Sequence, residues 1–122
     1  MIIKNKEIKF ISQEMFEIKD ITKEIKEFIK ESKINNGFIN IQTIHTTAKV
    51  FLNENEPLLL KDIKKNLEKI APKKDQYEHD DFEKRTKNMS KNESKNGHSH
   101  CKATYLPTNI TLNIVNKQII IK

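Results

Sequence analysis

The sequence predicts an α+β fold: a single compact domain over residues 1–122 with two main helices and a largely antiparallel β-sheet or sandwich. Two segments repeat apolar residues at helical spacing, and several short segments alternate apolar with polar residues. The length of 122 residues suits one domain with a real core. The order strand, helix, two strands, helix, long loop and three strands indicates the α+β class.

The first half of the chain supplies three strands and one helix. Residues 6–12 predict a strand, since Ile8 and Phe10 share one face. Apolar residues recur at helical spacing over 21–29, and Asn35-Asn36-Gly37 is expected to end that helix. Residues 38–45 and 48–52 alternate again, which predicts two strands and places His45 at the end of the first.

The second helix is expected after residues 53–56, with Asn55 as its N-cap and Pro57 in its first turn, and Pro72 should stop it. The polar stretch 73–96 is too long for an ordinary connection. We expect it to be mobile except near Tyr77 and His79. Strands over 100–106, 110–114 and 118–122 should follow, with a tight turn at Asn116-Lys117.

The composition argues against several classes of protein. The net charge of +6 comes from 23 basic and 17 acidic residues, which are interleaved as on a solvated surface. A nucleic-acid partner is disfavoured because basic residues and aromatics do not cluster. No apolar run reaches membrane-spanning length. The single Cys101 excludes an internal disulfide framework and favours the cytoplasm; we expect it to be buried as a small hydrophobe.

The histidines give the main functional signal, because all four lie in three short segments. These segments are 44–48 around His45, 77–79 ending in His79, and 96–100 with His98 and His100. Three imidazoles from separate segments are typical of a catalytic zinc-type site with water in the open position. In a strand, His98 would share a face with His100. The spacing matches no closed zinc motif, so scattered surface histidines are the alternative.

Polar residues near these histidines extend the candidate site. Glu54 is a candidate base, or a group that orients an imidazole. The helix start at Asn53 and Asn55 offers backbone N–H groups to an anion. Thr46 and Thr47 can bind phosphate oxygens, or satisfy their own turn. The alternatives for Asp62 are a solvent-facing ion pair and a ligand contact, and those for the basic segment 84–95 are a solvated loop and a lid or rim that attracts phosphate.

Taken together, these segments resemble the YjbQ family of small conserved proteins, known as secondary thiamine-phosphate synthases. The resemblance rests on Gly37, His45-Thr46-Thr47-Ala48, Leu52-Asn53-Glu54-Asn55-Glu56, Asp62, Pro72, Tyr77-Glu78-His79 and Asn96-Gly97-His98-Ser99-His100. It implies a trimer with clustered histidines near subunit boundaries that bind a metal or an anion. The family's Gly-Thr-Trp-Gln strand has no counterpart in this chain, which has no Trp, so we expect that C-terminal region to be missing.

The combined prediction is an enzyme that joins a pyrimidine pyrophosphate to a thiazole phosphate. Its partners would be a small phosphorylated molecule and two further copies in a homotrimer. The alternative is a non-enzymatic protein that binds a metal or a small anion. The predicted catalytic residues are His45, Glu54, His79 and His100, and the same three histidines would hold zinc or a similar divalent metal. The predicted ligand-binding residues are Thr46, Thr47, Asn53, Asn55, Asp62 and Asn96.

Overall fold

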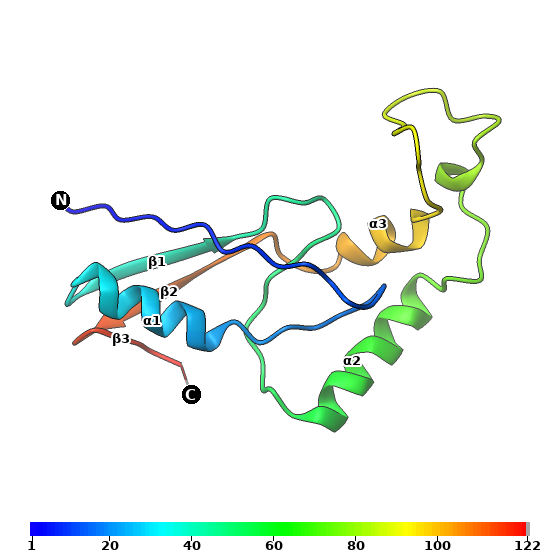
Figure 1. The fold of residues 1–122 in the computed structure, drawn as a ribbon. Coiled ribbons are helices and arrows are strands. Elements are labelled where there is room, and N and C mark those ends of the chain that lie inside the picture. The colour runs from blue at the N-terminus through cyan, green and yellow to red at the C-terminus, as the bar shows by residue number, and fades with distance from the viewer. Residues whose placement is uncertain (122) are drawn as a thin grey trace. The chain divides into compact units, whose positions relative to one another are not determined.

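The computed structural model describes residues 1–121, which form three α-helices, one 3-10 helix and three strands. In chain order these are α1 (Thr22–Ser32), β1 (Gly37–Gln42), α2 (Pro57–Ile70), η1 (Glu78–Asp80), α3 (Gly97–Ala103), β2 (Asn109–Val115) and β3 (Gln118–Ile119) (Figure 1). The chain forms two compact units, the first from residues 1–41 with those from 110 onward, the second from residues 42–109.

The first unit is a three-stranded sheet in the order β1-β2-β3 with α1 packed on it (Figure 1). Ile25 and Ile29 of α1 are buried together with Ile39, Ile114 and Ile119 of the strands. This confirms the α+β class. Strand β3 pairs antiparallel with β2. The turn between them is the predicted one, and both of its residues have positive φ, as primed hairpin turns require.

The predicted strand at residues 6–12 is wrong. Those residues are extended but have no strand partner. Ile8 packs on the core of the first unit, whereas Ile11 is exposed and breaks the alternation. Phe10 lies under the ammonium of Lys19, 4.4 Å from the ring centroid. A short apolar alternation therefore packs here without a ladder of backbone hydrogen bonds. The last predicted strand is also shorter than expected, and its end at Lys122 lies outside the described residues.

In the second unit, α2 begins where the sequence indicates but uses a different cap. Glu56, and not Asn55, is the N-cap, and its carboxylate accepts from the backbone N–H groups of Leu58 (2.9 Å) and Leu59 (2.8 Å). These bonds lower the pKa of Glu56. Pro57 occupies the first helical position, as predicted. The helix ends at Ile70, and Leu67 and Ala71 are buried.

Two other predicted strands of the second unit are absent. Residues 48–52 are not a strand; Val50 makes one backbone bond, to the carbonyl of Pro107 at 3.1 Å. Residues 100–106 were expected to be a strand, but 97–103 form helix α3. A long-range contact contributes, since the Asp80 carboxylate accepts from the N–H groups of Asn96 and Gly97, both at 2.9 Å. A carboxylate in this position stabilises a helix start.

Candidate histidine site

The central feature of the candidate site is a pair of imidazoles, one from η1 and one from α3. The rings of His79 and His100 meet edge to face with centroids 4.8 Å apart. The Nε2 atom of His79 is buried and has no hydrogen-bond partner, and the same is true of Oδ1 of Asn96. Within residues 1–121 these are the two buried side-chain nitrogen or oxygen atoms without a partner. Both residues belong to the set predicted from the sequence.

His45 is exposed on the loop that follows β1. Its Nδ1 accepts the backbone N–H of Thr47 at 3.2 Å and lies 3.0 Å from the Thr47 hydroxyl. Thr47 thus orients the imidazole and leaves Nε2 available. His45 is close enough to His100 for its charge to affect the titration of His100.

Burial and nearby charges lower the pKa of His100. Burial lowers the pKa of His100 most, followed by the charges of His79, Arg85 and His45, while Glu93 opposes them. A pKa below the ordinary histidine value favours the neutral imidazole of His100 at pH 7. A neutral imidazole can accept a proton or donate its lone pair to a metal ion.

Close packing joins η1 to α3 and thereby brings the two rings together. A Cβ atom placed on Gly97 would lie 2.5 Å from Cβ of Tyr77 and 3.2 Å from Oδ2 of Asp80. Glycine is therefore required at position 97 for space, not for a left-handed backbone, since its φ is not positive. The Tyr77 hydroxyl donates to the Pro72 carbonyl at 2.7 Å, which ties η1 to the end of α2.

Arg85 organises the loop that follows His79. Its guanidinium donates to the His79 carbonyl at 3.3 Å and forms an ion pair with Glu93 at 3.1 Å. The side chains of Arg85 and Glu93 are 12% and 15% exposed. Bonds from Ser90, and then the bond from Arg85, lower the pKa of Glu93 to about 2. The sequence did not suggest this internal network; the mobility of the loop stays a prediction.

The other predicted site residues lie at the surface. Thr46, Asn53, Glu54, Asn55 and Asp62 are exposed. The Asn53 side chain accepts the N–H of Glu54 at 2.8 Å, so it satisfies its own turn. Within the part of the chain that the structure describes, no hydrogen bond or ion pair joins Glu54 or Asp62 to His79 or His100. Their assignment as catalytic and ligand-binding residues stays a prediction.

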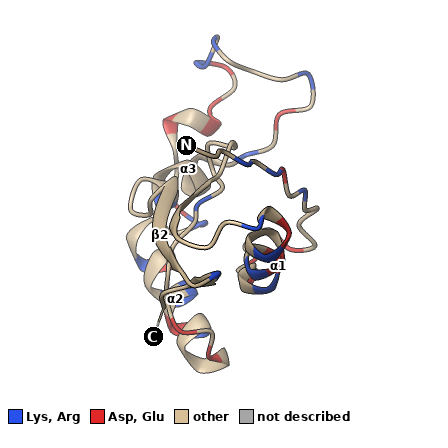
Figure 2. Ribbon diagram, turned by 90° about the vertical axis from the view of Figure 1, so that its left-hand side faces the viewer, with Lys and Arg blue, Asp and Glu red and all other residues tan. Residues whose placement is uncertain are grey.

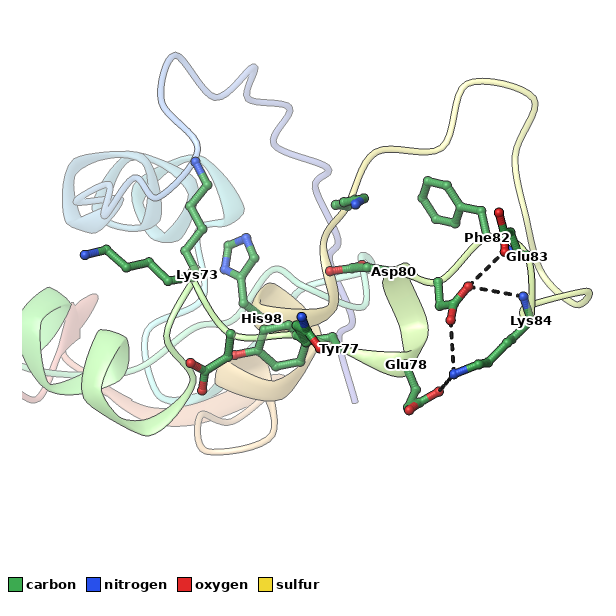
Figure 3. A pocket seen from close by; sticks show the side chains of 13 residues that line it. Lys73, Tyr77, Glu78, Asp80, Phe82, Glu83, Lys84 and His98 are labelled. Atoms are coloured by element: carbon green, nitrogen blue, oxygen red, sulfur yellow. Dashed lines mark hydrogen bonds and ion pairs between the residues drawn. The ribbon is translucent and has the colours of Figure 1, made fainter.

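The fourth histidine belongs to different surroundings, because α3 is a helix. Residues two apart lie about 200° apart around a helix, so His98 and His100 point to opposite sides, not to one side as a strand would have them. His98 is buried and lines a groove of about 780 Å³ (Figure 3). Burial lowers the pKa of His98 most, followed by the charge of Lys102. The groove lining includes none of the other three histidines.

Comparison with known proteins identifies the family. The sequence profile described as "UPF0047 protein YjbQ-like" matches residues 6–121. The chain belongs to this YjbQ-like family. A family protein of Methanothermobacter thermautotrophicus is 29% identical over 116 residues, covering 95% of this chain and 73% of that protein. One of Archaeoglobus fulgidus is 30% identical over 96 residues, covering 79% and 65%.

Solved structures of the family agree with the fold. An uncharacterized YjbQ/UPF0047 protein of Clostridium acetobutylicum has a TM-score of 0.69 at 30% identity, over 84% of this chain and 70% of its own. A YjbQ-like protein of unknown function from Sulfolobus solfataricus has a TM-score of 0.78 at 23% identity, over 91% and 72%. The second likeness shows the fold alone. The family is thus one whose function is uncharacterised. As for membranes, no helix among residues 1–121 is long and apolar enough to cross one.

The histidines have the right chemistry for the predicted metal site, but in the part of the chain that the structure describes no three ligands are grouped for an ion. Imidazole nitrogens suit zinc-like ions, and the unpartnered Nε2 of His79 is available as a donor. Among residues 1–121, however, no three His, Cys, Asp or Glu side chains are grouped to hold an ion.

Three features of this region escaped the sequence-based prediction. Asp80, the Arg85–Glu93 pair and Lys102 act through contacts between distant segments, which residue periodicity does not reveal. Cys101 was expected to be buried and is exposed, because α3 turns its side chain outward where a strand was predicted. Gly97 was visible in the sequence, but the reason for it, the approach of Tyr77, was not.

Proposed function

We propose that the histidine cluster of His45, His79 and His100 binds the phosphate groups of a small molecule. One observation carries the proposal: Nε2 of His79 and Oδ1 of Asn96 are buried without partners. An unpaired buried polar group costs about 1–3 kcal/mol, so two of them beside His100 point to a missing partner. A ligand with both donor and acceptor oxygens, such as a partly protonated phosphate, would satisfy them.

The reaction we propose is the one suggested by the YjbQ resemblance, in which a pyrimidine pyrophosphate and a thiazole phosphate give thiamine phosphate. A new bond to carbon forms as the bond to pyrophosphate breaks, so negative charge develops on the departing oxygens. His45 is exposed and able to contact the leaving group, whereas the charge of Arg85 is already balanced by Glu93. Neutral His100 can donate its ring N–H to those oxygens. Glu54 stays the candidate base or the group that orients an imidazole; the attacking thiazole nitrogen itself carries no proton to remove.

The second candidate function is non-enzymatic binding of a divalent metal or small anion. It is favoured by the low pKa of His100, since metal ions bind neutral imidazoles. A zinc-like ion at the cluster would stabilise negative charge on phosphate oxygens. In that case His45, His79 and His100 would be the ligands.

A single set of variants distinguishes these functions. Purified protein, prepared without chelator or affinity tag, is assayed for thiamine phosphate formation and for bound metal by elemental analysis. For an enzyme, His100→Ala abolishes product, and Cys101→Ala, an exposed neighbour on the same helix, retains it. For a binding protein, neither the natural chain nor either variant forms product, and His100→Ala alone loses bound metal or phosphate. Equal metal, phosphate binding and product in all proteins would refute both proposals.

We also propose a homotrimer located in the cytoplasm. The trimer comes from the family resemblance; exposed apolar side chains on the strands, such as Phe38 at 76%, leave surface to be covered. Light scattering should give about 43 kDa, three times the chain mass of 14.4 kDa. A mass near that of one chain at micromolar concentration would contradict it. The cytoplasm is proposed from the lone free Cys101.

A further inference from the structure

A buried lysine fixes the state of His98. The ammonium of Lys102 lies 2.6 Å from Oε2 of Glu68 and 3.1 Å from Nδ1 of His98. Lys102 is 8% exposed and His98 is 7% exposed. An ammonium has donors only, so it can bond to Nδ1 only when that nitrogen carries no proton. We therefore assign the His98 proton to Nε2, which makes the other ring nitrogen a hydrogen-bond donor.

The groove lined by His98 carries three lysines that have no ion-pair partner. Lys73, Lys74 and Lys95 line it, and none of them forms an ion pair within residues 1–121. Lys84 differs, because Glu78 and Asp81 hold its ammonium at 3.3 and 3.1 Å (Figure 3). Figure 2 shows that lysine and acidic residues both occur along the whole ribbon, so the groove is distinguished by the side chains that line it together with His98 and not by its lysines alone.

The wall of the groove is held in place by the same carboxylate that holds Lys102. Oε1 of Glu68 accepts the backbone N–H of Lys73 at 2.7 Å, while Oε2 accepts the Lys102 ammonium. Tyr77 lies against His98, with ring centroids 6.4 Å apart, and contributes an aromatic wall. The groove is thus lined by an imidazole donor, by lysines without an ion pair and by an aromatic face, the residue types that small-molecule sites combine.

We infer that this groove is a second anion site, separate from the histidine cluster, and that it binds a small phosphate ester. The phosphate contacts Lys73, Lys95 and Nε2–H of His98, and the remainder of the ligand lies against Tyr77. Five carboxylates also line the groove. Those of Glu78 and Asp81 are paired with Lys84, and that of Asp80 accepts the N–H groups of Asn96 and Gly97. Asp75 and Glu83 remain, so a long polyanion would be repelled while a compact ligand is accommodated. The site does not depend on the proposed function of the histidine cluster.

The test is titration of ¹⁵N-histidine-labelled full-length protein with inorganic phosphate and, separately, with phenyl phosphate. Both should shift the Nε2–H signal of His98, and phenyl phosphate should bind more tightly because it also covers Tyr77. The double variant Lys73→Gln/Lys95→Gln should weaken binding at His98 about tenfold or more. The matched control Lys23→Gln/Lys26→Gln removes the same charge from exposed positions on α1 and should leave the affinity within about twofold.

Two further variants keep the inference falsifiable. Lys102→Met should allow the His98 proton to occupy either nitrogen, which the ¹⁵N shifts report directly. His100→Ala should leave the His98 response to phosphate intact, even if it abolishes any response at the histidine cluster. The inference is overturned if phosphate leaves the His98 signal unchanged, or if both lysine double variants weaken binding equally.

Discussion

Replacement of Gly97 by alanine tests how the histidine site is held together. The new Cβ would lie 2.5 Å from Cβ and 2.9 Å from Cγ of Tyr77, well inside van der Waals contact. Cβ of Tyr77 is fixed to its backbone, so η1 and α3 must move apart. That movement would break the two 2.9 Å bonds from Asn96 and Gly97 to Asp80.

The size of the effect follows from these contacts. Overpacking a tight contact costs about 1–3 kcal/mol, and the strained hydrogen bonds to Asp80 place this substitution at the upper end. A loss of about 2–3 kcal/mol lowers the melting temperature of a domain of this size by roughly 6–15 °C. The His79–His100 ring contact, now 4.8 Å between centroids, should open as η1 shifts.

The assay is urea unfolding followed by circular dichroism, with Gly37→Ala as the matched control. A Cβ at Gly37 meets only Cγ2 of Ile34, at an ordinary 3.5 Å, so the same substitution there should change stability by about 0.5 kcal/mol or less. Equal stabilities for the two variants would refute the packing argument. So would unchanged NMR signals of His79 and His100 in Gly97→Ala.

Three other predictions concern single contacts. Asp80→Ala should lower the free energy of unfolding by about 1–2 kcal/mol, because α3 loses the carboxylate at its start; urea titration measures this, and the exposed Asp75→Ala should have little effect. Bonds from Ser90 and then from Arg85 lower the pKa of the Glu93 carboxyl from 4.5 to about 2, so these contacts stabilise the folded state fully above pH 4.5 and progressively less as the pH falls towards 2. Glu93→Gln should therefore be less stable than the natural chain at pH 6, and the difference should shrink as the pH falls to 2; a constant difference would contradict the linkage. Lys117→Gly should raise stability by roughly 0.5 kcal/mol, since Lys117 has φ of 63° in a turn that favours glycine; a thermal melt showing a loss would argue against it.

Helices α1 and α2 and the sheet of the first unit were predictable because each depends on a pattern of neighbouring residues in the sequence. α1 has an apolar stripe over several turns and α2 has Pro57 at its start, and both patterns are typical of helices rather than of strands or loops. The β2–β3 turn was predictable because Asn116 is of a type that tight hairpin turns favour, and both turn residues do adopt positive φ. The class of the fold followed from these elements.

The short segments were predicted less well because their structure depends on distant partners. Residues 97–103 are helical partly through Asp80, which lies in another segment. Residues 6–12 look like a strand but have no neighbour to pair with. His79 and His100 were chosen correctly as neighbours, whereas the grouping of His98 with His100 was wrong. That error follows from the assumption that this segment is a strand, with a repeat of two residues, whereas residues 97–103 form a helix.

The helical state of α3 makes a last prediction about its two histidines. If residues 98–100 were a strand, His98 and His100 would share one face, and replacing either would disturb the same site. On a helix, His98 instead shares a face with Lys102 one turn later, and His100 faces His79. In histidine NMR spectra, His98→Gln should therefore leave the His79 and His100 signals in place, and His100→Gln should leave the His98 proton on Nε2. Disturbance of all the remaining histidines by either substitution would mean that the two faces of α3 form a single site.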